Sequence, residues 1–307
     1  MAKGTALLIY NPGAGGNADK SAESYARALA SPDIQIRVHP LESGEDAARI
    51  ARDAIRENVA WIAVAGGDGT VETVAAEMID GSIPLGVIPA GTYNNFALSL
   101  GLPRDPIEAC AAIRTGKVKR MDVGTANGKP FFECAGAGLD AALFPFGEEI
   151  KGGNLLRWFT LLRRAWTYPR QHFTLTFDRP VCEAMTGGHS HSRKHRKRSL
   201  RVSALMVTAS NGPYYGMNFT IAPAARPDDG RLTVNVFKRY SKWELCRHFV
   251  SISYGKREYC PKAIAYRVKS LEIAGPHPLP AHLDGSPFEG WPLRIECHPQ
   301  ALPVFVP

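Results

Sequence analysis

The sequence lacks the features of a membrane-spanning, secreted or zinc-binding protein. No uninterrupted apolar run approaches the roughly 20 residues that a transmembrane helix needs. The first residues, MAKGTALLIY, do not form the regions of a signal peptide. Six cysteines are scattered without a C-x-x-C pair, so we expect free thiols and neither disulfides nor a zinc site. These absences predict a cytoplasmic protein.

Acidic residues are also scarce relative to basic ones. The chain has 37 lysines and arginines against 29 aspartates and glutamates, a formal net charge of +8. Such a balance favours polyanionic partners, namely nucleotides, nucleic acid or an anionic lipid surface. A hydrophobic content of 45% with 21% charged residues is typical of a globular protein and argues against disorder.

The chain up to about residue 120 alternates short apolar runs with helical patterns. This alternation with short connections favours a parallel sheet, so we expect a Rossmann-like α/β domain at residues 1–120. Its expected strands are Ala6–Tyr10, Ile34–Leu41, Trp61–Ala65 and Leu85–Pro89. Its expected helices lie near Asp19–Ala30, Glu45–Asn58 and Val71–Asp80.

After Lys119 the pattern changes to many short strands. A second, β-rich domain is therefore expected at residues 121–297, with a hairpin at Asn127-Gly128 and two helical segments, Leu155–Tyr168 and Lys242–Ser253. The proline-rich end, about residues 298–307, is expected to pack back on the first domain. The expected strands are Asp122–Ala126, Phe131–Cys134, His172–Phe177, Leu200–Ala209, Leu232–Phe237, Ala263–Ile273 and Leu293–Cys297.

Three turns of the first domain share one design, in which an apolar strand ends in small residues that lead into a helix. They are Tyr10–Gly16, Gly66–Thr70 and Pro89–Asn95. In a parallel sheet such turns emerge at one edge, and N–H groups at a helix start suit phosphate oxygens. For any single turn a tight connection is the alternative. None matches a Walker or dinucleotide fingerprint, so the three together indicate only a phosphate-bearing ligand.

Asp68 stands alone as an acid within the second of these turns. Because a carboxylate repels bound phosphates unless a cation lies between them, Asp68 implies Mg²⁺ or a hydroxyl donor. The alternative is an N-cap for the helix expected from Val71, although Thr70 suits that position well.

GGDGT, Gly66 to Thr70, is similar to a signature shared by diacylglycerol, sphingosine and NAD kinases and phosphofructokinases. The stretch IPLGVIPAGTYNNFALSLGLP is more selective and resembles the lipid-kinase pattern P-x-G-T-x-N-D-F-A. FFECAGAGLDA, ASNGPYYGMNFTIAPAARPDDGRLTVNVF and LPAHLDGSPFEGWPLRIECHPQALPVFVP resemble further segments of the diacylglycerol kinase catalytic-domain family in order. The resemblance covers most of the chain and is closest to the bacterial soluble lipid kinases.

The resemblance implies a nucleotide site between an α/β domain and a β-sandwich domain, with ATP and Mg²⁺ as cofactors. It also implies a structural Mg²⁺ at the carboxylate of Asp229, with main-chain carbonyls near Arg226 and Arg231 as further ligands. A plain turn is the alternative for that loop. By position, the nucleotide-binding residues would be Asn11, Gly66, Gly67, Asp68, Gly69, Thr70, Thr92 and Asn94.

The sequence departs from the family pattern at chemically important positions. The glutamate of the family's D-G-E, the expected general base, is replaced by Ser286, whose hydroxyl cannot serve as a base near neutral pH. This leaves Asp284 and Asp68 as the candidate catalytic residues. The usual V-N-E after GGDGT reads Val71-Glu72-Thr73, and the usual N-D of the third turn reads Asn94-Asn95.

Two basic segments are candidates for contact with anionic lipid or nucleic acid. The basic run within Ser190–Arg201 is expected to be an exposed loop, either a solvated one or one that contacts anionic lipid. It has no interleaved aromatics, which argues against nucleic acid. The basic helix expected at Leu155–Trp166 either docks on a membrane or, as we favour, packs on a sheet.

The sequence therefore predicts an ATP-dependent lipid kinase with a diacylglycerol-like substrate. We expect it to contact anionic membrane surfaces transiently, as a peripheral cytoplasmic protein, and not to bind nucleic acid. A catalytically degenerate nucleotide- or lipid-binding protein of the same fold is the main alternative, and an NAD kinase-like enzyme is another. The sequence leaves open whether the protein forms a homodimer.

Overall fold

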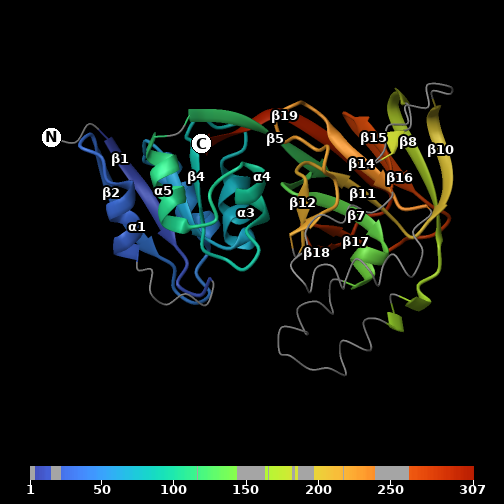
Figure 1. Cartoon of the computed structure of the whole chain (residues 1–307), viewed down its shortest axis with the longest axis horizontal. Coiled ribbons are helices and arrows are strands. Elements are labelled where there is room, and N and C mark those ends of the chain that lie inside the picture. The colour runs from blue at the N-terminus through green and yellow to red at the C-terminus, as the bar shows by residue number, and fades with distance from the viewer. Residues whose placement is uncertain are drawn as a thin grey trace. The chain divides into compact units, whose positions relative to one another are not determined.

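The computed structural model describes residues 4–14, 22–115, 117–143, 163–164, 166–181, 184–185, 197–216, 218–238 and 263–307. Helices and strands carry the labels of Figure 1. The chain divides into two compact units, residues 1–123 with 299–307 and residues 124–298. Within the described residues, no helix has the length and apolar character needed to cross a membrane.

The first unit is built on a parallel sheet with the strand order β4-β3-β1-β2. The end of β19 adds a further parallel pairing, Val304 with Leu85 of β4. The strands are β1 (Gly4–Tyr10), β2 (Ile34–Pro40), β3 (Ile62–Gly66) and β4 (Leu85–Pro89). The helices are α1 (Ala22–Leu29), α2 (Ala47–Arg56), α3 (Asp68–Glu77), α4 (Asn95–Ser99) and α5 (Pro106–Thr115). The expected Rossmann-like parallel α/β architecture is confirmed.

Helices explain why the central strands of this sheet are apolar throughout. All five residues of β3 and of β4 are buried, as expected for parallel strands covered on both faces. α1 packs on α5, and α2 packs on α3. Leu8, Ala65 and Ile113 belong to one core cluster beneath α1 and α5. The glycine-rich turns therefore begin at the ends of buried strands that helices cover.

The second unit contains two antiparallel sheets and a small hairpin. One sheet has the order β10-β8-β16-β19, with β5 paired to β19 and β6, and the other has the order β18-β17-β7-β11-β14-β15-β9. Its strands are β5 (Lys117–Ala126), β6 (Lys129–Phe131), β7 (Cys134–Gly138), β8 (Gln171–Val181), β9 (Ala184–Met185), β10 (Lys197–Ala204), β11 (Met206–Ser210), β12 (Tyr214–Tyr215), β13 (Phe219–Thr220), β14 (Leu232–Val236), β15 (Ile264–Val268), β16 (Ser270–Ala274), β17 (Ala281–Leu283), β18 (Ser286–Phe288) and β19 (Leu293–Val306). The strands β5 and β19 run through both units.

A single apolar core joins these two sheets. Phe173 and Phe177 of β8 and Leu271 of β16 lie in the same buried cluster as Val207 of β11 and Val234 of β14. Alternate residues of each strand therefore point inward, which is the packing of a β-sandwich. The expected β-sandwich-type second domain is confirmed.

The hairpin expected at Asn127-Gly128 is confirmed. Asn127 has φ 49° and Gly128 has φ 81°, and Ala126 pairs with Lys129 across the turn. Positive φ at both turn residues is the geometry that Asn-Gly favours between strands.

Four other predictions need correction. The strand expected at Phe131–Cys134 is the end of β6, a bend at residues 132–133 and the start of β7. The single strand expected at Leu200–Ala209 is two strands, because Leu205 interrupts it between β10 and β11. The loop expected through Arg201 is wrong for residues 197–201, which belong to β10. The strand expected at Ala263–Ile273 likewise divides into β15 and β16.

Both helical segments expected in the second domain lie largely or wholly outside the described residues. Of the first, only residues 163–164 and 166–168 are described, and Trp166 is 40% exposed. Lys242–Ser253 lies entirely outside the described residues.

Candidate functional site

The glycine-rich turns follow β1, β3 and β4, whose carboxyl ends share one edge of the parallel sheet. The first turn is tied to the second by one side-chain bond, in which Asn11 Nδ2 donates to Thr70 Oγ1 at 2.9 Å. Asn11 also accepts from the main-chain N–H of Gly13 at 3.0 Å. Asn11 therefore holds its own turn closed and anchors it to the start of α3. Gly15 and Gly16 lie outside the described residues.

The second and third turns touch through their backbones. A Cβ atom added to Gly91 would collide with the Cα of Gly67, so the third turn accommodates no side chain at Gly91. Asn94 has a left-handed φ of 54°, and its amide both accepts from the Gly91 N–H and donates to the Gly91 carbonyl, at 2.9 and 2.8 Å. Thr92 is exposed at the tip of this turn.

Asp68 connects the same two turns through its carboxylate. α3 begins at Asp68 and not at Val71, with Gly67 in the N-cap position. Asp68 Oδ1 accepts from the N–H of Phe96, 28 residues along the chain, at 3.2 Å. Burial raises the pKa of Asp68, and the N–H groups of Phe96, Asn95 and Asn94 partly oppose that rise. Asp68 thus caps α4 rather than its own helix.

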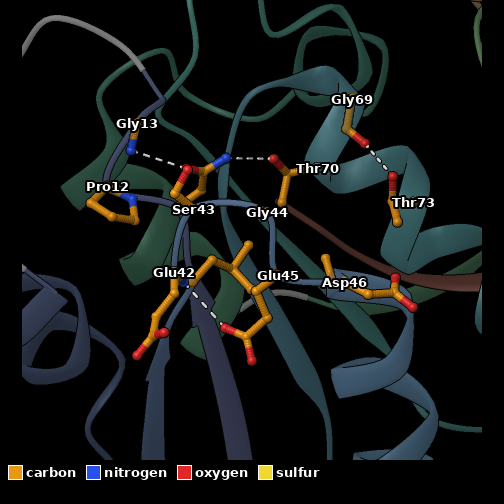
Figure 2. Close-up of a pocket in the computed structure, with 13 residues that line it drawn as sticks. Pro12, Gly13, Glu42, Ser43, Gly44, Glu45, Asp46, Gly69, Thr70 and Thr73 are labelled. Carbon is orange, nitrogen blue, oxygen red and sulfur yellow. Dashed lines mark hydrogen bonds between the residues drawn. The ribbon is translucent and has the colours of Figure 1, made fainter.

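A pocket of about 520 Å³ opens beside these turns within the first unit (Figure 2). Asn11, Gly69 and Thr70 of the predicted nucleotide site line it, and the other predicted residues do not, namely Gly66, Gly67, Asp68, Thr92 and Asn94. Pro12, Gly13 and Thr73 add to the same side, and the opposite wall is the turn after β2, residues 41–47, which our reading of the sequence did not select. An acid directly after the second strand of a Rossmann-like sheet was the available signal, because such acids bind ribose hydroxyls.

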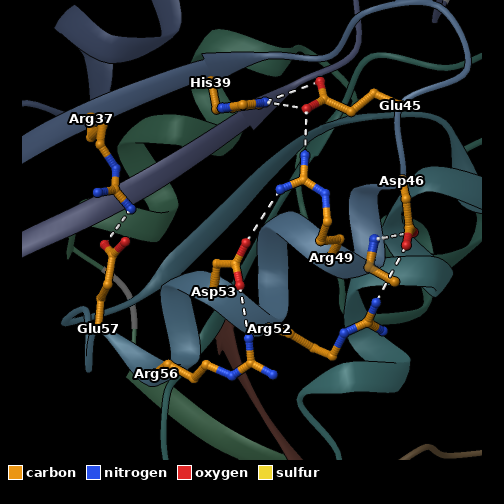
Figure 3. Close-up of polar contacts among 10 residues, drawn as sticks. Arg37, His39, Glu45, Asp46, Arg49, Arg52, Asp53, Arg56 and Glu57 are labelled. Carbon is orange, nitrogen blue, oxygen red and sulfur yellow. Dashed lines mark hydrogen bonds and ion pairs between the residues drawn. The ribbon is translucent and has the colours of Figure 1, made fainter.

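Three carboxylates of that turn, Glu42, Glu45 and Asp46, line the pocket. Two of them are already paired with basic groups (Figure 3). Glu45 lies 3.1 Å from both His39 Nε2 and Arg49 Nη2. Asp46 caps α2 by accepting from the Ala48 N–H at 3.0 Å and lies 3.3 Å from Arg52.

The charge of the pocket wall depends on the ionisation of its carboxylates. The Glu42 N–H and the His39 imidazole hold the pKa of Glu45 below its usual range. Glu45 therefore stays ionised at neutral pH. The pocket is lined by residues at the start of α3 on one side and by carboxylates on the other.

In the second unit, Asp284 lies in the two-residue turn of the β17–β18 hairpin. Asp284 has φ 46° and Gly285 has φ 86°, and Leu283 pairs with Ser286 across the turn. The Asp284 carboxylate accepts three consecutive main-chain N–H groups at 2.7–2.9 Å, those of Phe132, Glu133 and Cys134. Oδ1 takes two of these bonds and Oδ2 takes one.

Desolvation dominates the titration of this carboxyl. Burial raises the pKa of Asp284 to about 6, although the three N–H groups and the nearby His282 oppose the rise. Ser286, at the position of the family's glutamate, is exposed at the first residue of β18. The hairpin therefore presents one partly buried carboxyl and one exposed hydroxyl.

His282 is a buried polar residue of this hairpin that our reading of the sequence missed. Its Nε2 lies 3.0 Å from Asp140 Oδ2, and the Gly285 N–H donates to its Nδ1 at 3.3 Å. The ring stacks on Tyr215 with centroids 5.3 Å apart. The sequence signal for the hairpin that contains His282 was the Asp284-Gly285 pair, because Asp-Gly between short apolar runs predicts a hairpin.

The third predicted site is the loop before β14 that contains Asp229. Its carboxylate forms an ion pair with the guanidinium of Arg267, which also donates from Nη1 to the Ala224 carbonyl at 2.9 Å. Among the residues that the structure describes, no group of three His, Cys, Asp or Glu side chains is placed to hold a metal ion. The donors present do not fit the Mg²⁺ that the resemblance implied, because a cation of the chain already engages the carboxylate.

Comparisons with known proteins agree with this architecture. Residues 5–126 match the diacylglycerol kinase catalytic domain, and residues 149–306 match the YegS C-terminal NAD kinase beta sandwich-like domain. A Pseudomonas aeruginosa protein named "Probable lipid kinase YegS-like" is 28% identical over 318 residues, covering 100% of this chain and 96% of that protein. A Klebsiella pneumoniae protein of the same name is 29% identical, with 98% and 95% covered.

One solved structure, described as one of the diacylglycerol kinases of Bacillus anthracis, superposes with a TM-score of 0.70. It is 22% identical and covers 99% of this chain and 97% of that chain, a level of identity that supports the fold alone. The family models that match the two domains place the chain in the class of kinase-like phosphotransferases. The chain belongs to the diacylglycerol kinase catalytic-domain family, among its YegS-like, lipid-kinase-like members.

Proposed function

We propose that the protein is an ATP-dependent lipid kinase that phosphorylates a hydroxyl group of a diacylglycerol-like lipid. The observation that carries the proposal is the pocket beside α3, which joins a helix start to a wall of carboxylates. A nucleotide has the complementary charge pattern, with anionic phosphates at one end and hydroxyl donors at the other. Family membership supports phosphoryl transfer as the reaction class.

The phosphates are proposed to lie at the first turn of α3. Gly69 is exposed there, and no atom lies within 4 Å of where its Cβ would be. Main-chain N–H groups at a helix N-terminus favour phosphate oxygens. The carboxylates of the β2 turn would repel phosphates and accept hydroxyl donors, so they favour the ribose end of the nucleotide.

Two aspartates are proposed to have different duties. Asp68 is a positioning residue, because its carboxylate fastens the start of α4 beside the start of α3. Asp284 is proposed to orient the lipid hydroxyl and accept its proton. Its Oδ2 holds only one N–H, and a carboxyl with a pKa of about 6 is a suitable proton acceptor near neutral pH.

Magnesium is proposed to arrive with the nucleotide, where it supplies neutralisation of the phosphate charge. The protein's own part is to place the phosphates against the turns after β1 and β3. Asn11 and Thr70 contribute by holding those turns together.

A binding protein without turnover is the second candidate. Two observations favour it. Ser286 stands where the family has glutamate, and Asp284 already accepts three main-chain hydrogen bonds. Such a protein would bind ATP and lipid with no transfer.

Labelled ATP, Mg²⁺ and a mixed lipid extract test the two candidates together. The kinase predicts label in a lipid band, and this label is lost in a Gly69→Leu variant that still folds. ATP binding measured by calorimetry, without label in any lipid, would support the binding protein instead. Absence of both would contradict both candidates.

Transient contact with an anionic membrane remains a proposal. It rests on the basic run, of which Lys197, Arg198 and Arg201 are exposed on β10. Binding to phosphatidylserine vesicles should weaken with salt and in a variant with these three residues changed to glutamine. Binding that is unaffected by either change would contradict the proposal.

A further inference from the structure

The loop before β14 is fastened to the outer face of the second sheet of the sandwich. Leu232, Val234 and Val236 of β14 point into the apolar core, so Thr233 and Asn235 lie on the opposite face. Arg267 of β15 is the direct cross-strand partner of Thr233 and shares that face. The sheet therefore presents a polar row beneath the segment that leads to Asp229.

Side chains of this row bind the segment at three points. Asn235 Nδ2 donates to the Ile221 carbonyl at 3.2 Å. Arg267 donates to the Ala224 carbonyl at 2.9 Å and pairs with the Asp229 carboxylate. One guanidinium thus gathers a carbonyl and a carboxylate from the same loop, which are the two kinds of oxygen ligand that a hard divalent cation would gather.

We infer that Arg267 takes the structural place of a metal ion in this loop, so that the Asp229 loop is ordered without Mg²⁺. Charge supports the inference, because Arg226, Arg231 and Arg267 outnumber the two carboxylates of Asp228 and Asp229. A planar guanidinium carries several N–H donors, so it can bind a carboxylate and a carbonyl at once. A metal ion in the same place would need further oxygen ligands to complete its coordination. Any magnesium used in the proposed reaction would then belong to the nucleotide.

Hydrogen exchange of the amides in residues 221–231, measured without nucleotide, tests this directly. In the unaltered protein, exchange should be the same in excess EDTA and in excess Mg²⁺. In Arg267→Met it should be roughly tenfold faster, because the loop opens more often when the cation is lost. Arg267→Lys keeps the charge but not the fork of donors, so it should fall between the two.

Arg294→Met is the matched control, since it removes another arginine of the same unit. That residue forms an exposed pair with Glu272 at 3.3 Å, and its loss should leave exchange in the loop unchanged. Asp229→Asn removes the ion pair but leaves the bond from Arg267 to the Ala224 carbonyl, so exchange in this variant should lie between that of the unaltered protein and that of Arg267→Met. The double variant should exchange no faster than Arg267→Met alone.

Two results would overturn the inference. One is faster loop exchange of the unaltered protein in EDTA, with that effect abolished by Asp229→Asn, because the loop would then hold a metal. The other is an Arg267→Met protein that folds and exchanges its loop amides at the unaltered rate.

Discussion

Each unit contains an Asp-Gly pair whose carboxylate binds main-chain N–H groups of a segment distant in sequence, yet the two pairs have different structures. Asp68-Gly69 opens α3 after a buried strand, and its partner is the start of α4. Asp284-Gly285 turns a hairpin, with positive φ at both residues, and its partners are three N–H groups in the segment after β6 and at the first residue of β7. The flanking residues, and not the dipeptide, decide which structure forms.

The difference separates two kinds of duty. Asp284 is bonded on both oxygens and joins the β17–β18 turn to residues 132–134. Gly69, by contrast, faces a pocket, with Asp68 beside it to place the next turn. The pair in the first unit is thus built around space for a ligand, and the pair in the second unit is built around a carboxylate.

The largest expected effect is the loss of the Asp284 carboxylate. Asp284→Ala leaves three N–H groups without their acceptor, and we expect the free energy of unfolding to fall by about 3 kcal/mol. Denaturant unfolding measures this, with Asp228→Ala, an exposed aspartate of the same unit, as the control. A loss no larger than the control's would show that the carboxylate does not hold the hairpin.

Asp68→Asn should act mainly on turnover. The amide keeps the shape of the side chain but weakens the bond to the Phe96 N–H, so the turn after β4 shifts from the start of α3. We expect kcat to fall roughly 100-fold, because small misplacements of binding groups have effects of that size. Steady-state kinetics measure this, and the contradicting outcome is an unchanged kcat in a folded variant.

Replacing Gly69 and Gly285 by alanine should change the free energy of unfolding in opposite directions. Gly69 is helical and has open space at Cβ, so Gly69→Ala should raise stability by about 0.5–1 kcal/mol. The added methyl group enters the pocket and should weaken ATP binding. Gly285 has φ 86°, so Gly285→Ala should lower stability by about 1–2 kcal/mol.

Thermal unfolding and calorimetry of both glycine variants make this test. Changes of the same sign in stability would remove the distinction drawn between the two Asp-Gly pairs. Full ATP affinity in Gly69→Ala would count against the proposed phosphate position.

The last prediction concerns the pH dependence of stability. The folded protein raises the pKa of Asp284 from 3.8 to about 6, so it binds this proton more tightly than the unfolded chain does. The resulting stabilisation is complete below the ordinary pKa and is lost as the pH rises from about 4 to about 6. The difference in Tm between the unaltered protein and Asp284→Asn, followed across that range, should shrink with rising pH, and a constant difference would contradict the raised pKa.

Local patterns predicted most of the first unit. The four strands before residue 90 lie within a residue or two of their expected positions, because buried parallel strands read as apolar runs between helices. The Asn127-Gly128 hairpin was equally readable, since both residues favour positive φ. The short strands β17 and β18 were missed, although Asp284-Gly285 carries a similar turn signal.

The candidate site was less predictable. That the turns after β1, β3 and β4 share an edge follows from a parallel sheet. The contacts of Asp68 with Phe96 and of Asp229 with Arg267 do not follow from it. The two residues are 28 positions apart in the first contact and 38 in the second, and only packing brings them together. The wall of carboxylates at residues 42–46 was overlooked, although an acid directly after the second strand of a Rossmann-like sheet was an available signal.

The amino-acid sequence by itself determined the class of each unit, the glycine-rich turns and the family, because these depend on periodicity, turn chemistry and local motifs. Only the tertiary structure decided what each carboxylate binds. Asp68 caps a helix that follows a different strand, Asp284 holds three N–H groups about 150 positions away, and Asp229 meets an arginine on a neighbouring strand. The energy of a charged side chain depends on the donors that packing brings to it, and those donors come from elsewhere in the chain.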